Sequence, residues 1–318
     1  MKPRFSIIKR APYWILLGAC LLVVAHFLFF KNVQLSEEFT GGINIGISTN
    51  VEEQNLDSSI RTYLDSINYK DAKIFIDTQD IGTKIKINTQ IESDDKVAEL
   101  SRNIQNLLIE QKYISSDEEI IEQSIIGPSV GSYMQKTARS AVLVGLVFMA
   151  IYMLISFSVI RKVISPGILA SITILTMIFD ISIPAGAYGL RMMFDPTIQV
   201  DTVFIIAILT TMGYSINDTI IIFDRIRENF QNKGGTKDIV YGKIFEQSLR
   251  QTMRRSFGTV LSTLLVIVAM YIFGTGDIKE FAFTIGIGVI AGSYSSIFIS
   301  APLAYLIMGK YKKEKNKL

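Results

Sequence analysis

Six long apolar runs constrain this chain more than any other feature. A helix needs about 20 mostly apolar residues to cross the hydrocarbon core of a bilayer. Six segments meet or approach that length: residues 11–30, 138–159, 164–186, 200–223, 257–274 and 281–308. Only 19% of the residues are charged, against about 25% in a soluble domain. We therefore predict an α-helical membrane protein with six transmembrane helices.

Basic residues are distributed unevenly around these runs. Lys and Arg accumulate in the short segments on the cytoplasmic side of a membrane. The N-terminal segment, the loop after the second span, residues 224–256 and the tail hold 19 basic residues, whereas the two short loops on the other side hold only Arg191 and Lys279. We predict that both termini lie in the cytoplasm. Because the basic residues flank apolar runs and form no single stripe, we expect membrane lipid and no nucleic acid as a partner.

The segment between the first and second spans has the opposite character. Residues 31–137 hold 18 acidic and 10 basic residues, and their apolar residues follow a β-α-β-β-α-β pattern. Strands are expected near residues 43–47, 73–77, 83–88 and 119–126. The first helix, with an Asn50 cap, has the apolar face Leu56, Ile60, Leu64 and Ile67, and the second, from Ser93, has Val97, Leu100, Ile104 and Leu107. We predict a small α+β ferredoxin-like domain.

Four regions follow from these patterns. They are a cytoplasmic N-terminus with the first helix (1–30), an extracytoplasmic domain (31–136), a five-helix transmembrane domain (137–309) that includes a cytoplasmic loop (224–256), and a basic cytoplasmic tail (310–318). The single cysteine, Cys20, excludes an internal disulfide and a cysteine-rich metal site. We expect no metal and no cofactor.

The fourth span carries an acidic residue at membrane depth. Asp218 lies seven residues before Arg225, which is about 10 Å of helix, and a carboxylate there costs about 2.5–3.5 kcal/mol. Helical spacing predicts a polar stripe on its side, consisting of Thr211, Tyr214 and Ser215, with Asn217 adjacent. Either Asp218 is a protonatable relay or cation site, or it is a structural residue hydrogen-bonded across a helix interface. We favour the first interpretation.

The third span carries a second acid, Asp180, predicted within a turn or two of the outer end of its helix. For this residue, ion transfer and structural hydrogen bonding stay equal alternatives. Acids on successive spans also raise the alternative of an intramembrane aspartyl protease, which needs two carboxylates that share a proton. Such enzymes usually have glycine directly before one acid, whereas Asn217 precedes Asp218. We therefore expect no enzyme.

The residues around Asp218 form a long motif, Gly-Tyr-Ser-Ile-Asn-Asp-Thr at 213–219, followed by Asp-Arg-Ile-Arg-Glu-Asn at 224–229. This motif resembles the signature of the SecF branch of the SecD/SecF protein-export family, within the resistance-nodulation-division superfamily. Phe-Thr-Gly-Gly at 39–42, Ile-Gly-Pro-Ser-Val-Gly at 126–131 and residues 292–298 agree with it. The resemblance covers nearly the whole chain in the right order.

The resemblance implies an accessory subunit of the Sec machinery in the bacterial cytoplasmic (inner) membrane. Such a subunit uses the transmembrane proton (or sodium) gradient with a SecD-like subunit to drive late steps of polypeptide translocation. The implied partners are the SecD-like subunit, the Sec translocon channel and translocating polypeptides. The implied ion-coupling residues are Asp218, Arg255, Asn217, Ser215 and Thr219, with Asp180 and Arg254 as secondary candidates.

Two departures from the family pattern concern the secondary candidates. Arg254 replaces a small residue, which leaves the assignment between Arg254 and Arg255 open. Phe179 stands where many members have histidine before Asp180. The alternative within transport is half of a small-molecule or lipid exporter of the same superfamily, which would need a larger outer domain.

Overall fold

The computed structural model describes residues 6–48, 53–79, 82–89, 93–116, 119–157, 165–232 and 241–315. They form two compact units. The membrane unit contains the described residues of Met1–Asn32, Val142–Leu190 and Val203–Leu318, and the soluble unit those of Val33–Ala141 and Arg191–Thr202. The predicted Asn50 cap, the basic residues Arg161, Lys162, Lys233 and Lys237, and the last three residues of the predicted tail lie outside the described residues.

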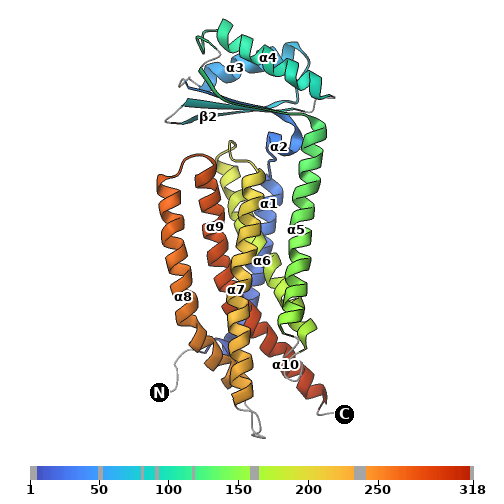
Figure 1. Cartoon of the computed structure of the whole chain (residues 1–318), viewed down its shortest axis with the longest axis vertical. Helices are drawn as coiled ribbons and strands as arrows, with labels where there is room; N and C mark the ends of the chain where they lie inside the picture. Colours follow the sequence, from blue (N-terminus) through green and yellow to red (C-terminus); the bar gives the residue numbers. More distant parts are fainter. Residues whose placement is uncertain are drawn as a thin grey trace. The chain divides into compact units, whose positions relative to one another are not determined.

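Six helices are long and apolar enough to cross a membrane, which confirms the predicted number of spans (Figure 1). The first is α1 (Ala11–Asn32), preceded by the short η1 (Ile8–Arg10). The next four are α5 (Pro128–Ser156), α6 (Pro166–Phe194), α7 (Thr202–Asn232) and α8 (Tyr241–Phe273). The last span consists of α9 (Asp277–Tyr294), the π-helical η4 (Ser295–Ser300) and α10 (Ala301–Lys315).

These helices extend beyond the apolar runs, and one prediction was wrong for that reason. α6 continues through Pro184 to Phe194, so Asp180 lies midway along the helix and not near its outer end. Its C-terminal half continues because Gly186 and Gly189 pack directly on the backbone of α1 at Ala25 and Phe29. The described parts of the predicted loop 224–256 are helical, as extensions of α7 and α8.

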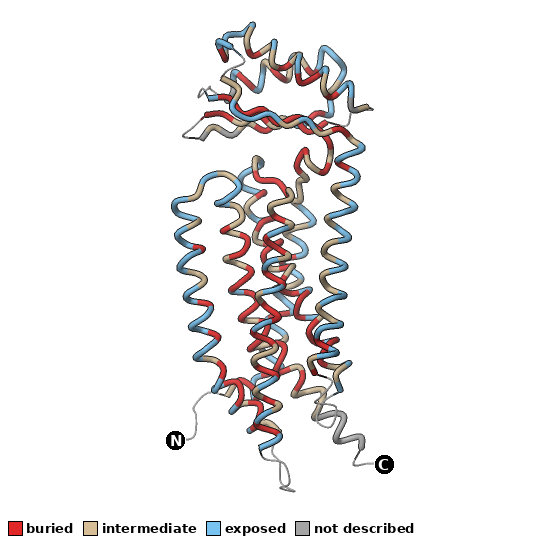
Figure 2. Tube along the Cα trace, in the orientation of Figure 1, coloured by how far each residue is buried: buried red, intermediate tan, exposed pale blue. Residues whose placement is uncertain are grey.

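Three helices form the interior of the membrane unit. In the most apolar window of α6, α7 and the last span, half or more of the residues are buried, against less than a fifth in α1, α5 and α8. Figure 2 shows the same contrast along the tube. Asp180 on α6 and Asp218 on α7 therefore both lie on interior helices.

The soluble unit is a four-stranded sheet with helices on one face (Figure 1). Its strands are β1 (Gly42–Ile47), β2 (Lys73–Gln79), β3 (Gly82–Asn88) and β4 (Ile120–Ile126). They lie in the order β2-β3-β1-β4 with antiparallel neighbours. With α3 (Glu53–Ser66) and α4 (Asp94–Glu110), this is the predicted split β-α-β arrangement. A short helix, α2 (Glu37–Thr40), precedes β1.

The core of this unit lies between the sheet and the two helices. Ile43, Ile45 and Ile47 of β1 are buried as predicted, because alternate residues of a strand share one face. One residue of the predicted apolar faces was wrong, because Ile67 lies beyond the end of α3 and is 38% exposed. Leu107 is partly buried and packs against this core, next to the fully buried Leu108. Leu108 follows Ile104 by four residues, one helical turn on the same face.

The Phe-Thr-Gly-Gly motif has a backbone explanation. Gly42 has φ +151°, and a Cβ there would lie 2.3 Å from the carbonyl oxygen of Ile87. Only glycine allows β1 to begin so close to β3 in this conformation. The motif therefore fixes the entry of the chain into the sheet.

Candidate ion-coupling site

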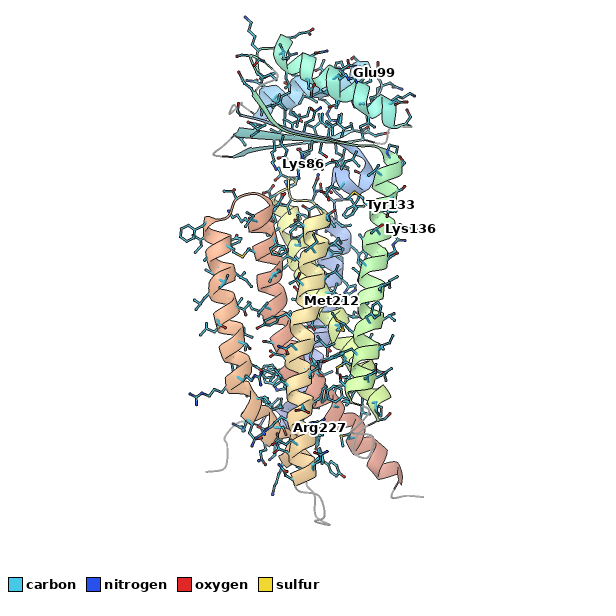
Figure 3. All side chains as sticks on the ribbon, viewed as in Figure 1. Lys86, Glu99, Tyr133, Lys136, Met212 and Arg227 are labelled. Carbon is cyan, nitrogen blue, oxygen red and sulfur yellow. The ribbon has the colours of Figure 1, made fainter. Side chains whose placement is uncertain are left out.

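Asp218 lies near the middle of α7 and is 3% exposed. The Ser293 hydroxyl of α9 donates a hydrogen bond of 3.3 Å to its Oδ2. Met212, labelled in Figure 3, lies less than two turns earlier on α7 and is fully buried. Asp218 is thus a carboxyl group inside the bundle, and it contacts α9.

Asp180 is the second buried acid, and it has no exposed surface. The Ser215 hydroxyl of α7 donates a short hydrogen bond to its Oδ2. Its Oδ1 has no hydrogen-bond partner among the described residues. Ser215 lies three residues before Asp218 on α7. Asp180 therefore bonds to the stretch of α7 that carries Asp218. This contact connects α6 to the helix that carries Asp218.

Small residues of α9 allow α7 to pack close to it. A Cβ on Gly288 would lie 2.3–2.4 Å from Thr211 side-chain atoms, and one on Gly292 would lie 2.9 Å from the Cβ of Ser215. Gly288, Gly292 and Ser296 thus form a row of small residues along which α7 packs. The close approach also brings hydroxyl groups together. The hydroxyl oxygens of Thr219 and Ser296 lie 2.8 Å apart, within hydrogen-bond distance.

The last span changes its helical form next to these hydroxyl groups. The segment η4 (Ser295–Ser300) is π-helical, and such segments are rare and frequently lie at functional sites. Immediately before it, the Tyr294 hydroxyl donates to the Trp14 carbonyl oxygen of α1 at 2.9 Å. Ser295, Ser296 and Ser300 are all buried. The π-helix therefore lies between α1 and the polar interior of α7.

The structure brings most of the predicted site residues together. Asp218, Ser215, Thr219 and Asp180 are buried in one connected region, as described above. Asn217, next to Asp218 in sequence, is exposed. Arg254 and Arg255 are both exposed on α8.

Sequence reasoning missed the residues that the last span contributes. Ser293 and Ser296 contact α7 from α9 and η4. The row of serines from Ser293 to Ser300 in an apolar run was the available signal, because a hydroxyl at membrane depth usually has a hydrogen-bonding task. Ser256 of α8 is also buried, and its hydroxyl has no partner of ordinary geometry in the described part of the chain.

This arrangement can bind and release a proton or a small cation. A buried carboxylate is costly unless it is neutralised or paired, and the partner found for Asp218 among the described residues is the Ser293 hydroxyl group. Among the described residues no group of three or more His, Cys, Asp and Glu side chains could hold a metal ion. The bonds found for the two acids go to different serines, and none joins the acids to each other. A proton-sharing protease dyad is therefore not formed by the described contacts.

Comparison with known proteins gives a consistent result. Residues 108–310 match the family model of the protein export membrane protein SecD/SecF, C-terminal. The chain is 32% identical to the protein translocase subunit SecF of Sebaldella termitidis, over 96% of this chain and 94% of that protein. It is 31% identical to the SecF subunit of Vibrio alginolyticus, over 84% of this chain and 78% of that one.

Two solved structures resemble the whole chain. The crystal structure of SecDF, a translocon-associated membrane protein from Thermus thermophilus, matches with a TM-score of 0.74 and 28% identity over 98% of this chain. SecDF in the super-membrane-facing form matches with a TM-score of 0.66 and 27% identity over 100% of this chain. The chain covers only 39% and 40% of those two longer chains.

Proposed function

This chain belongs to the SecD/SecF family of protein-export membrane proteins, and on that premise we propose how it contributes to export. It acts as an accessory subunit of the Sec machinery, in the bacterial cytoplasmic membrane with both termini in the cytoplasm. Together with a SecD-like subunit, it uses the transmembrane proton (or sodium) gradient to drive late steps of polypeptide translocation. Its role is transport and not covalent catalysis.

The burial of Asp218 at mid-membrane carries this proposal. The free energy available from the membrane potential is about 2.3 kcal/mol per charge per 100 mV. A protein can use it only if ion binding favours one of two conformations. Asp218 contacts Ser293 on a neighbouring helix, so gain or loss of its charge changes a contact between helices. Alternating charge on Asp218 would therefore change the packing of α7 against α9.

Arg255 and Asp180 have different roles in this scheme. We assign Arg255, and not Arg254, to the relay, because Arg255 is the position that the family resemblance implies. Asp180 has no exposed surface, and an isolated ionised carboxylate in such a place would be very costly. It is therefore a neutral group that positions Ser215. Ser215 and Thr219 hold the hydroxyl network around Asp218.

An open face on α7 and α8 supports a SecD-like partner. A Cβ on Gly213 or Gly258 would meet no atom within 4 Å, and Asn217 is exposed on α7. An amide side chain and bare glycines facing lipid are unfavourable, whereas small and polar residues are typical of contacts between membrane helices. The SecDF chains that match this one are much longer, so a separate chain would supply the remaining part. In this arrangement Asn217 contacts the partner and not Asp218.

The soluble unit, within the proposed domain 31–136, is the part that would contact translocating polypeptides near the translocon channel. β2 and β4 are the edge strands of the sheet. An edge strand can pair with an extended peptide through its backbone.

The decisive experiment replaces Asp218 by Asn. The amide keeps the size of the side chain and its hydrogen bonds but cannot release a proton. Export of a preprotein trapped at a late stage would be measured in membrane vesicles that contain the SecD-like partner, with and without an imposed gradient. The gradient-driven part of export should be lost, while the amount of inserted protein stays normal, because burial of a neutral amide costs less than burial of a charge.

Asp224→Asn is the matched control. Asp224 lies six residues further along α7, is half exposed and pairs with Arg227 at 2.7 Å, so its loss should leave export nearly unchanged. Export by the Asp218→Asn variant that still responds to the gradient at the wild-type rate would refute the coupling proposal. Gradient-driven efflux of a small molecule without any effect on export would favour the exporter alternative.

A further inference from the structure

A cluster of polar side chains, here called the amide clamp, joins the end of α7 to the start of α8. Asn229 of α7 is 6% exposed, and its Nδ2 donates hydrogen bonds of 2.8 Å to the Ser248 hydroxyl group and to Oε1 of Gln251, both on α8. The Nε of Arg225 donates to the same Gln251 oxygen at 2.7 Å. Arg227, labelled in Figure 3, lies between the two α7 residues of the clamp. The pairing is antiparallel, because the earlier residue of α7 meets the later residue of α8.

The clamp lies beside apolar contacts that also hold the two helices together. The ring centre of Phe230 lies 5.3 Å from that of Tyr241 and 6.1 Å from that of Phe245. Ile226 and Leu249 are buried in the same apolar cluster. Apolar contacts favour association of helices, whereas a buried, hydrogen-bonded amide specifies the register between them. The clamp is therefore suited to fix how far α8 is displaced along α7.

The helix faces that form the clamp also carry the proposed ion-coupling residues. On α7, Arg225 and Asn229 follow Asp218 by seven and eleven residues. These separations are close to two and three whole turns, so the three residues lie on one face. On α8, Arg255 follows Gln251 by four residues, one turn further on a shared face. One face of each helix therefore includes both the clamp and a residue of the proposed relay.

The clamp also fixes the depth of Arg255 along the pair of helices. From the level at which Arg225 meets Gln251, Asp218 lies about 10 Å along α7, and Arg255 lies about 6 Å along α8 in the same direction, at 1.5 Å per residue. The two relay residues are thus within one helical turn of the same depth. A slip of α8 by one turn, about 5.4 Å, would change that separation substantially.

We propose that Asn229 and Gln251 are positioning residues for ion coupling, which hold α8 in the register that keeps Arg255 near the depth of Asp218. This inference rests on the proposed function, in which Arg255 belongs to the relay. The two amides act on the relay only through the position of α8. Without them, the apolar contacts still join the helices, but α8 occupies more than one register, and Arg255 is within reach of Asp218 for less of the time.

The test replaces the two amides by apolar side chains of similar shape, Asn229→Leu with Gln251→Met. Replacement of both partners of a hydrogen bond in this way is nearly neutral for stability, whereas the polar determinant of the register is lost. The matched control makes the same two exchanges at the exposed end of α7, Asn232→Leu with Gln231→Met. A rescue variant, Asn229→Gln with Gln251→Asn, moves one methylene group from one helix to the other and keeps an amide pair of the same combined length.

Three measurements are made on each protein. Register is measured as the distance between spin labels on cysteines that replace the exposed Asp224 of α7 and Ser262 of α8, in a Cys20→Ser background. Thermal unfolding measures stability. Export in membrane vesicles with the SecD-like partner, with and without an imposed gradient and over a range of external pH, measures coupling. The label distance requires no export, and Asp218→Asn is measured in parallel, so failure of the proposed function is distinguishable from failure of the clamp.

For Asn229→Leu with Gln251→Met we expect an unfolding temperature close to that of the wild type and a broader distribution of label distances. Gradient-driven export should fall about fivefold or more, since residues of one hydrogen-bonded network are coupled at about this level. The pH profile of the remaining export should change as it does when Arg255 is replaced by Lys. Gradient-independent export should be unaffected, and the rescue variant and the control should resemble the wild type.

Three results would overturn the proposal. An unchanged distribution of label distances would show that the amides do not set the register. Normal gradient-driven export despite a broader distribution would show that the register does not matter for coupling. A fall in export that accompanies a lower unfolding temperature, with an unchanged pH profile, would show that the clamp only stabilises the pair of helices.

Discussion

In the soluble unit the side chains removed from solvent are mainly isoleucine and leucine, whereas the membrane unit hides Asp180, Asp218 and several serines and turns large apolar residues outward. The residues exposed on each unit are those that its surroundings, water or lipid, solvate favourably. In water, burial of apolar area drives folding. In lipid, apolar burial gives no such gain, and helices associate through close packing and hydrogen bonds.

The difference shows why the same residue type has opposite meaning in the two units. An unpaired aspartate would be a defect in the isoleucine core of the sheet, where the buried Ser101 accepts a hydrogen bond from Gln123. In the membrane unit, the same groups join helices and hold the site of the proposed ion coupling. The comparison predicts that substitutions will have effects that depend on the unit, and four experiments test this.

The largest effect is expected where an acid enters the apolar core of the soluble unit. Ile45 has no exposed surface and lies opposite Ile85 on β3. Ile45→Asp should cost about 4–5 kcal/mol or more, which would unfold this unit. Limited proteolysis of the full chain measures it, as rapid cleavage within residues 33–141. Lys86→Asp, on the open face of β3, is the control and should remain resistant. If Ile45→Asp is as resistant as wild type, the assigned core is wrong.

The second largest effect is expected where a side chain is added to the close packing between α7 and α9. Gly288→Val places a side chain where a Cβ would already lie 2.3 Å from Thr211, and overpacking of this kind costs about 1–3 kcal/mol. Thermal unfolding of the purified chain should occur at lower temperature. Gly213→Val, at a position with no atom within 4 Å, should leave the unfolding temperature unchanged or raise it slightly. Equal destabilisation by both variants would show that close packing at α9 is not what matters.

A smaller effect is expected for the hydrogen bond to Asp218. Ser293→Ala removes a bond worth about 1 kcal/mol, so gradient-driven export should fall about fivefold, and Ser293→Thr should restore much of it. Ser262→Ala is the control, because that hydroxyl is exposed and bonds only within its own helix to Thr259. Full activity of Ser293→Ala would show that gradient-driven export does not need the hydrogen bond between Asp218 and α9.

The smallest effect is expected for an ion pair on the soluble unit. Lys84 and Glu122 lie 2.9 Å apart on the sheet and are both partly exposed. Lys84→Met should change the stability of this unit by about 1 kcal/mol or less, and high salt should abolish the difference. Hydrogen exchange of the strand amides at low and high salt measures it. A larger, salt-independent loss would mean that this pair is part of the core.

Much of the architecture could be predicted from the sequence. Apolar runs predict spans because only a continuous helix satisfies its backbone in lipid, and alternating isoleucines predict β1 because a strand has a period of two. The burial of Asp218 and Ser215 was also predictable, since both lie on one helical face. The central position of Asp180 was not, because the apolar run ends before α6 does.

The sequence by itself determined which elements form, their order along the chain, and the presence of an acid at membrane depth. These depend on local periodicity and on solvent, and both can be read from neighbouring residues. Only the tertiary structure decided that Ser293 and Ser296 contact α7, that Asn217 is exposed while Asp218 is buried, and that Asn88 lines a cavity bordered by lysines. These facts depend on how elements distant in sequence rotate and approach one another, which is set by side-chain packing between them and not by the pattern within either one.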